Sequence, residues 1–296
     1  MSETALRDVN TIPESERNDG RFERWNRELW SRDGNSEVEY IGSENLNTVE
    51  DVENCLKTLL SRLDSKDWSS VCEALNDVRR LSIFHKEAIV GVLNDVISLI
   101  VKSLKNPRSA VCKTAIMASA DIFKAFSDDI IDSVDPLLVQ LLLKSSQDKR
   151  FVCEAAESSL IALTTWVSPI LLLPKLEPFI KNRNPRIRAK DSMCVCRSVP
   201  QLGVDGIEAF WIDKLIQIGA SQLSDRLPES RDAACTLLLE LQSVYEKSHV
   251  LKPTAVSEES AIASWENFCQ SKLSPSSAQA VLRVTNITRE GLVLGS

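Results

Sequence analysis

Apolar residues return every three or four positions along most of this chain, as they do on one face of an α-helix. A clear example is the series Val111, Ala115, Ala118 and Ile122, and a similar series begins at Val152. A β-strand would instead alternate apolar and polar residues at every second position. The spacing therefore predicts amphipathic helices.

This helical pattern itself repeats about every 40 residues. Five segments share a short loop followed by an apolar or small residue that opens a helix, which we call the slot residue. The slot residues are Val71, Val111, Val152, Ile187 and Ser230, at spacings of 40, 41, 35 and 43 residues. A second apolar helix precedes each loop, and a short loop makes two successive helices antiparallel. Such a period with two helices per unit is typical of HEAT-type solenoids.

We therefore expect an all-α fold: a HEAT-repeat (ARM-type) α-solenoid of five to six antiparallel helix pairs. Five pairs fall within residues 51–250. A sixth, within residues 257–284, would cover the open end of the core, as terminal repeats do. The predicted domain spans residues 46–284, and residues 285–296 are expected to form a flexible tail.

Residues 1–45 lack the repeat and are strongly charged, so we expect an acidic, largely disordered arm. The first 50 residues carry six Arg and twelve Asp or Glu, whereas the remainder carries 29 basic and 30 acidic side chains. Trp25 and Trp30 are spaced to share one face of a short helix. That face either packs on the first repeat or binds a partner.

Composition and charge exclude several classes of protein. Hydrophobic residues make up 43% of the chain and charged residues 26%, which is typical of a folded globular protein. A net charge of −7 argues against nucleic acid as the partner. No apolar run approaches the roughly 18 residues of a membrane span, and no secretory signal is recognisable. We expect a cytoplasmic protein that binds neither nucleic acid nor membrane.

The eight cysteines include no CxxC pair, and most fall inside apolar helical patterns. Buried thiols in a reducing cytosol explain them better than a disulfide framework does. Cys194 and Cys196 are close in sequence, but CxC without further ligands is a weak metal signal. We expect no metal and no cofactor.

The sequence also offers little for catalysis. Its two histidines, His85 and His249, have no serine or cysteine nearby in a nucleophile motif. Neither a GxxxxGK[ST] phosphate loop nor a GxGxxG motif is present. We therefore expect a non-catalytic protein that binds another protein.

The short loops within helix pairs occupy equivalent positions, so they should line up along one edge of the stack. Nine-residue windows around the five slot residues carry charges of −1, +2, 0, +4 and −1, although residues 51–296 have a net charge of −1. A basic edge of this kind would attract an acidic protein surface. The basic candidates are Arg108, Lys113, Lys149, Arg150, Arg186, Arg188, Lys190 and Arg231.

Trp68, at the first of these loops, is the aromatic candidate, because tryptophan often anchors protein interfaces. The alternative is that Trp68 folds inward and closes the end of the first pair. Each basic residue, taken alone, fits a solvated charge at a helix start better than a contact, so the binding hypothesis depends on the row as a whole.

Two of these segments resemble a known family. LDSKDWSSVCEALNDVRRL, residues 63–81, resembles the opening repeat of TOG domains of the CLASP N-terminal and crescerin (TOG-array) type. LKNPRSAVCKTAI, residues 104–116, resembles the second TOG repeat. The similarity covers roughly residues 50–250, and its fourth and fifth repeats are generic HEAT repeats.

TOG domains bind tubulin along the edge made by the loops within helix pairs. The resemblance implies that Trp68 lies against β-tubulin, with Arg108 and Lys113 following on the second loop. It places Lys149 and Arg150 on the third loop. The side chains it directs toward the α-subunit are Arg186, Arg188, Lys190 and Arg231.

The resemblance thus implies a tubulin- or microtubule-binding domain associated with the cytoskeleton. The alternative is a HEAT/ARM-repeat scaffold for a different protein partner. TOG proteins usually carry several such domains, whereas this sequence holds one and no basic tail. A single domain would bind tubulin weakly, reach microtubules through a partner, or keep only the scaffold.

Overall fold

A computed structural model describes residues 40–207, 212–250 and 264–293, and the regular elements in these ranges are helices without a strand. The all-α prediction is therefore confirmed. The chain separates into two compact units, Met1–Leu46 and Asn47–Ser296. In the first unit, the described part contains one 3-10 helix, η1 (Ser43–Asn45). The rest of the predicted acidic arm, residues 1–39 with Trp25 and Trp30, lies outside the described ranges.

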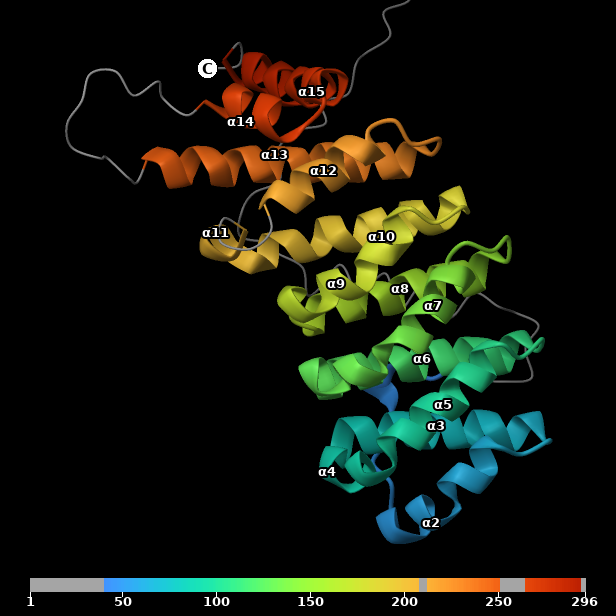
Figure 1. Cartoon of the computed structure of the whole chain (residues 1–296). Helices are drawn as coiled ribbons and strands as arrows, with labels where there is room; N and C mark the ends of the chain where they lie inside the picture. The colour runs from blue at the N-terminus through green and yellow to red at the C-terminus, as the bar shows by residue number, and fades with distance from the viewer. Residues whose placement is uncertain (1–39, 208–211, 251–263, 294–296) are drawn as a thin grey trace, which may run out of the picture. The chain divides into compact units, whose positions relative to one another are not determined.

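The second unit is a succession of helix pairs (Figure 1). The pairs are α2 (Val52–Leu63) with α3 (Trp68–Phe84), α5 (Leu93–Leu104) with α6 (Ser109–Phe126), α7 (Val134–Lys144) with α8 (Arg150–Trp166), α9 (Pro169–Ile180) with α10 (Pro185–Ser198), α12 (Ile212–Gln222) with α13 (Pro228–Val250), and α14 (Trp265–Lys272) with α15 (Pro275–Val293). The connections between pairs hold α4 (Lys86–Ile89), η2 (Val90–Val92), η3 (Ser127–Ser133), η4 (Val199–Leu202) and α11 (Gly203–Gly206).

The second helices of successive pairs pack on one another, from α3 to α6, α8, α10 and α13. Their shared core contains the positions that the periodicity selects: Val111, Ala115, Ala118 and Ile122 are all fully buried. Burial of each of the two larger side chains, Val111 and Ile122, stabilises the fold by about 1.5–3 kcal/mol. The HEAT-type stack is therefore confirmed in its pairing and in its core.

The apolar series Leu171, Leu176, Phe179 and Ile180 predicts the buried face of α9. The prediction is wrong for Leu171, because 38% of it is exposed. Helix α9 starts at Pro169, so Leu171 lies in its first turn, on the side of the stack where the chain passes from α8 to α9. Leu172 and Leu176 face the core in its place.

The cysteines are free thiols, and several have a defined structural role. Cys112 donates to the carbonyl of Leu104 at 3.4 Å, and Cys153 donates to the carbonyl of Ser145 at 2.8 Å. Each thiol thus reaches a carbonyl left unbonded at the end of the preceding helix. In the second and third pairs, the cysteine that follows the slot residue thus connects the two helices of its pair.

The predicted sixth pair is present as α14 and α15. Trp265 is buried against Tyr245 and Phe268, and its indole Nε1 donates to Thr285 Oγ1 at 3.2 Å. Thr285 thus belongs to the packed pair, and α15 continues to Val293 where a flexible tail was expected. The pair covers the end of the core beside α13.

Candidate protein-binding edge

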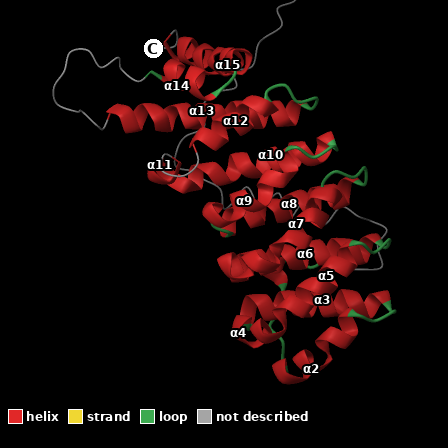
Figure 2. Ribbon diagram, in the orientation of Figure 1, coloured by secondary structure: helices red, strands yellow, loops and turns green. Residues whose placement is uncertain are grey.

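The loops within the first five helix pairs gather along one side of the stack, as the green segments of Figure 2 show. We call this row the loop edge; it comprises residues 64–67, 105–108, 145–149, 181–184 and 223–227, with the first turns that follow them. Figure 1 shows α4 and α11 on the other side, where the chain passes between pairs.

Local hydrogen bonds fix the shape of these loops. Asn106 Oδ1 accepts from the backbone N–H of Arg108, Asn182 Oδ1 from that of Asn184, and Asp225 Oδ1 from that of Leu227, at 2.9–3.0 Å. Such Asx turns bring the chain into the next helix with little freedom. In the first loop, Asp67 caps α3 by accepting from the backbone N–H groups of Ser69 and Ser70. Four of the five loops are therefore fixed by local hydrogen bonds to their own side chains.

Trp68 and Arg108 join the first two loops. The guanidinium carbon of Arg108 lies 4.9 Å from the centroid of the Trp68 ring. Trp68 is half-buried and Arg108 is exposed. The indole thus packs partly inward and still presents surface at the edge. This position is intermediate between the exposed anchor and the inward-folded side chain considered from the sequence.

Lys113 is not part of the exposed loop edge, although the sequence placed it there. It is 3% exposed, in the second turn of α6, and its Nζ stands 5.7 Å from the centroid of the Phe151 ring. A partner that approached the loop edge would meet Arg108, but it would not reach this ammonium group.

The third loop is open to solvent. Lys149 and Arg150 are both exposed at the start of α8. Lys149 Nζ donates to Ser109 Oγ at 3.3 Å, and Arg150 pairs with Glu154 at 2.7 Å on its own helix. Within the described residues, no carboxylate lies within ion-pair distance of Lys149 or Arg108.

Three basic residues of the helix that follows the fourth loop, Arg186, Arg188 and Lys190, have carboxylate partners in neighbouring repeats. Arg186 pairs with Asp148 at 2.6 Å, and 55% of the arginine side chain remains exposed. Lys190 pairs with Glu157 at 2.6 Å, and only 19% of its side chain is exposed. The charge of +4 counted at this loop is therefore partly neutralised across the stack.

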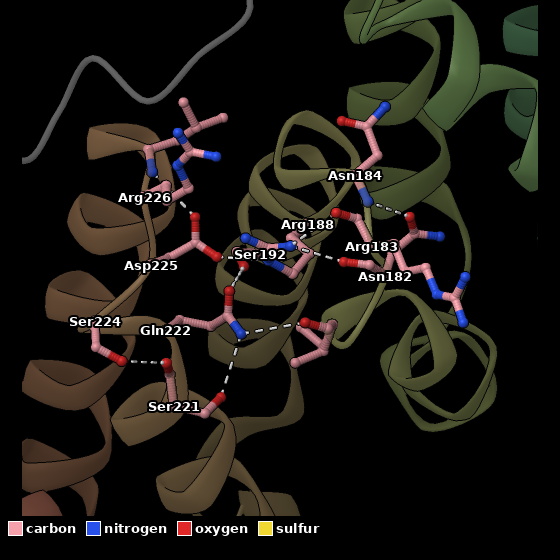
Figure 3. A network of polar contacts seen from close by, with 12 residues as sticks. Asn182, Arg183, Asn184, Arg188, Ser192, Ser221, Gln222, Ser224, Asp225 and Arg226 are labelled. Carbon is pink, nitrogen blue, oxygen red and sulfur yellow. Dashed lines mark hydrogen bonds and ion pairs between the residues drawn. The ribbon is translucent and has the colours of Figure 1, made fainter.

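Arg188 forms the tightest of these links, and Figure 3 shows the network around it. Its Nε donates to Asp225 Oδ2 at 2.6 Å, and its Nη1 donates to the carbonyl of Asn182 at 2.8 Å. Burial raises the pKa of Asp225, but hydrogen bonds from Arg188 and the N–H of Leu227 outweigh it and lower that pKa below its ordinary value. The pair fastens the fourth loop to the fifth.

Two further residues, Arg231 and Gln222, bind backbone carbonyls at or beside the fourth and fifth loops. Arg231, half-buried, donates to the carbonyls of Asp225 and Arg226 at 2.8 and 3.1 Å. Gln222 accepts from Ser192 Oγ and donates to the carbonyl of Ile180, so it bridges α12 to α10 and α9 (Figure 3). Sequence reasoning missed Asp148, Glu157 and Asp225, because their partners lie more than 30 residues away in the chain.

Two further kinds of feature are absent from the described residues, a metal-binding group and a membrane-spanning helix. Among them, no group of three or more His, Cys, Asp or Glu side chains is arranged to hold a metal ion. No helix in the described ranges has the length and apolar character needed to cross a membrane.

The fold and its edge define the class of protein: an α-solenoid of HEAT-type helix pairs whose short loops form one continuous surface. Among solved structures, it resembles the MAST/Orbit N-terminal domain, with a TM-score of 0.55, 14% identity, and coverage of 78% of this chain and 96% of that one. The TOG domain of C. elegans Zyg9 matches with a TM-score of 0.54, 16% identity, and coverage of 92% and 97%. A structure described as showing that crescerin uses a TOG domain array to regulate microtubules in the primary cilium gives a TM-score of 0.54, 16% identity, and coverage of 78% and 88%.

The chain has the fold of a TOG domain. Its sequence is similar to TOG array regulator of axonemal microtubules protein 1 of Homo sapiens, with 29% identity over 117 residues, and to that of Mus musculus, with 29% identity over 114 residues. The matched segments cover 40% and 38% of this chain but only 7% and 6% of those proteins. No family model matches the sequence.

Proposed function

We propose that this chain binds the αβ-tubulin heterodimer, free or within a microtubule, through the loop edge. The observation that carries the proposal is the row of ordered loops that begins at the Trp68–Arg108 pair and continues through exposed basic side chains. The relatives' names connect TOG arrays with axonemal microtubules, which supports the choice of partner. Tubulin is strongly acidic, so its surface complements a basic edge.

The contacts that we propose are Trp68, Arg108, Lys149, Arg150 and Arg186, because these side chains are exposed or half-exposed at the edge. Trp68 would supply the apolar anchor, and the basic side chains would guide the encounter and fix the orientation. In this proposal, Lys113, Arg188, Lys190 and Arg231 support the edge from within the stack. The role is non-catalytic, in the cytoplasm and at the cytoskeleton.

The direct test is co-elution of the purified full chain with αβ-tubulin on size exclusion at low salt. We expect a complex that weakens as salt rises to about 0.3 M, because surface charges are screened there. The double variant Trp68→Glu, Arg108→Glu should lose the complex. Lys247→Glu is the matched control: it also reverses an exposed charge, but on α13 away from the loops, and it should co-elute like the parent chain.

The second candidate is a scaffold that uses the same edge for a different acidic protein. It is favoured by the internal pairing of Arg188 and Lys190, which leaves fewer free charges than the sequence indicated. If the folded chain fails to co-elute with tubulin even at low salt, the tubulin proposal is wrong and the scaffold takes its place.

A further inference from the structure

Each loop of the loop edge has one residue at an equivalent position, two places before the helix that follows, which we call the tip residue. In four loops, the side chain that precedes the tip residue accepts the backbone N–H that follows it, as Ser65 Oγ does from Asp67 at 3.1 Å. In the third loop, the start of α8 gives the alignment. The tip residues are Lys66, Pro107, Asp148, Arg183 and Arg226.

The tip residues are all exposed, so a partner at the loop edge would meet them. Three of them, Lys66, Arg183 and Arg226, are basic. No carboxylate of the described residues lies within ion-pair distance of these three side chains. They add to the exposed charge of Arg108 and Lys149, and they favour acidic groups on a partner.

Asp148 is the acidic exception in this row. Its side chain is 90% exposed, and Arg186 lies 2.6 Å away. The other acidic residues of the five loops are placed differently: Asp225 is 4% exposed, Asp67 caps α3, and Asp64 pairs with a lysine of α5 at the start of the first loop. Asp148 thus puts negative charge where the other loops have a basic residue or proline.

Arg186 offsets this charge only in part. Its Nη1 donates to Asp148 Oδ1 at 2.6 Å and to the carbonyl of Ser146 at 3.2 Å, so the third loop holds the guanidinium group. Because both members of the pair are exposed to water, their attraction is weak and each charge still acts on a partner. The pair separates the basic tip of the first loop from the basic tips of the fourth and fifth loops.

We infer that Asp148 is a specificity-determining residue of the loop edge. It disfavours a continuous run of acidic groups, and it favours a partner with two acidic patches separated by a neutral or basic group that faces Asp148. A like charge placed against a partner is how an interface excludes the wrong ligand. The inference rests on the proposed function, because it takes the loop edge as the binding surface.

The experiment compares the full chain with Asp148→Asn, which removes the charge and keeps a hydrogen-bond acceptor for Arg186. Two ligands are titrated at low salt against the labelled proteins: poly-L-glutamate, which is uniformly acidic, and αβ-tubulin. We expect Asp148→Asn to bind poly-L-glutamate about three- to fivefold more tightly. This gain should disappear as salt rises to about 0.3 M. Tubulin affinity should gain less than twofold or fall.

Asp95→Asn is the matched control. Asp95 is exposed at the start of α5, at the end of that helix farther from the second loop, and its substitution changes the net charge equally. It should leave both affinities unchanged. Thermal unfolding of Asp148→Asn should match that of the parent chain, because exposed pairs contribute little to stability. A second variant, Arg183→Gln, should weaken poly-L-glutamate binding, because it removes a basic tip.

Arg186→Gln tests whether Asp148 itself faces the ligand. In this variant Asp148 has lost the guanidinium group, so adding Asp148→Asn should tighten poly-L-glutamate binding by at least the same factor. If the gain disappears in this background, Asp148 acts only by covering Arg186, and the inference is wrong.

Other outcomes would also overturn it. Poly-L-glutamate might bind neither protein or both equally, or Asp148→Asn might tighten tubulin binding as much as poly-L-glutamate binding. In the last case, Asp148 opposes acidic ligands without discriminating among them. If the parent chain does not bind tubulin at all, the proposed function is wrong, and the poly-L-glutamate titrations still decide the role of Asp148.

Discussion

Arg79 of α3 and Asp121 of α6 form an ion pair at 2.7 Å in the interface between the first two repeats, with 1% and 6% of their side chains exposed. Arg79 also donates to Asn76 at 3.1 Å. A charge taken out of water is tolerated when its partner is held at this distance, and it becomes costly when the partner is removed.

We therefore expect Asp121→Ala to lower the free energy of unfolding by about 3–5 kcal/mol, because it leaves the Arg79 guanidinium buried without its carboxylate. Urea unfolding followed by circular dichroism measures the change. The double variant Arg79→Met, Asp121→Leu should recover most of the loss. Equal stability of the parent chain and Asp121→Ala would show that the pair contributes nothing.

Asp191 of α10 is a buried carboxyl group that has no charged partner among the described residues, unlike Asp121. Both of its carboxylate oxygens are buried without a hydrogen-bond partner, and burial raises its pKa well above the ordinary value of 3.8. Above that ordinary value the unfolded chain releases the proton while the folded chain retains it. The contribution of Asp191 to the free energy of unfolding is therefore fully present below about pH 3.8, and it decreases as pH rises toward the pKa of the folded state.

Asp191→Asn should therefore be more stable than the parent chain at neutral pH. The difference should grow with pH, by at most about 1.4 kcal/mol per unit, between pH 4 and the folded pKa. Urea unfolding of both proteins across this range gives the difference directly. A difference independent of pH would mean that Asp191 is ionised in the folded state.

Asp225 should destabilise the fold when its charge is removed. With 4% of its side chain exposed and Arg188 at 2.6 Å, Asp225→Ala is expected to cost about 3 kcal/mol at neutral pH. Since the folded pKa of Asp225 is lowered, its contribution is present above the unfolded value and is lost as pH falls through the folded one. Thermal unfolding at neutral and acidic pH tests both statements.

Glu154→Ala is the matched control for Asp225→Ala. Glu154 also pairs with an arginine, but 89% of the side chain of Arg150 is exposed. Exposed pairs one helical turn apart are worth only about 0.3–0.5 kcal/mol. Similar losses for the two alanine variants would contradict the role assigned to burial.

The thiols should react slowly in the native protein. Burial raises the pKa of Cys153 to about 11 and that of Cys269 to about 12, so little thiolate exists near neutral pH. Iodoacetamide at pH 8, followed by mass spectrometry, should modify these two cysteines only after urea is added. Rapid modification of Cys153 without denaturant would show that α7 and α8 separate readily.

The sequence predicted the stack well because the slot residues and their helical series depend on local spacing. Val111 and Val152 are buried as expected, and even Ser230 in the fifth slot is fully buried. The row of loops followed from the repeat in the same way. The resemblance to TOG domains rested on the Asp67-Trp68 loop, and the fold agrees with it.

The charge of the edge was harder to predict. Lys113 lies in the second turn of α6 and faces inward, and nothing in its local spacing distinguishes it from the exposed Arg108. Arg186 and Arg188 meet carboxylates of neighbouring repeats, which only the stacked structure brings together. A count along the chain therefore overestimated the charge that is available to a partner.

The hydrogen bonds from Asn106, Asn182 and Asp225 to the backbone two residues ahead have a consequence for how binding proceeds in time. These loops lose their conformational freedom when the chain folds, so an arriving partner does not have to order them. Encounters at this surface should then proceed in a single kinetic phase, with a rate governed by diffusion and ionic strength and without a slow rearrangement step.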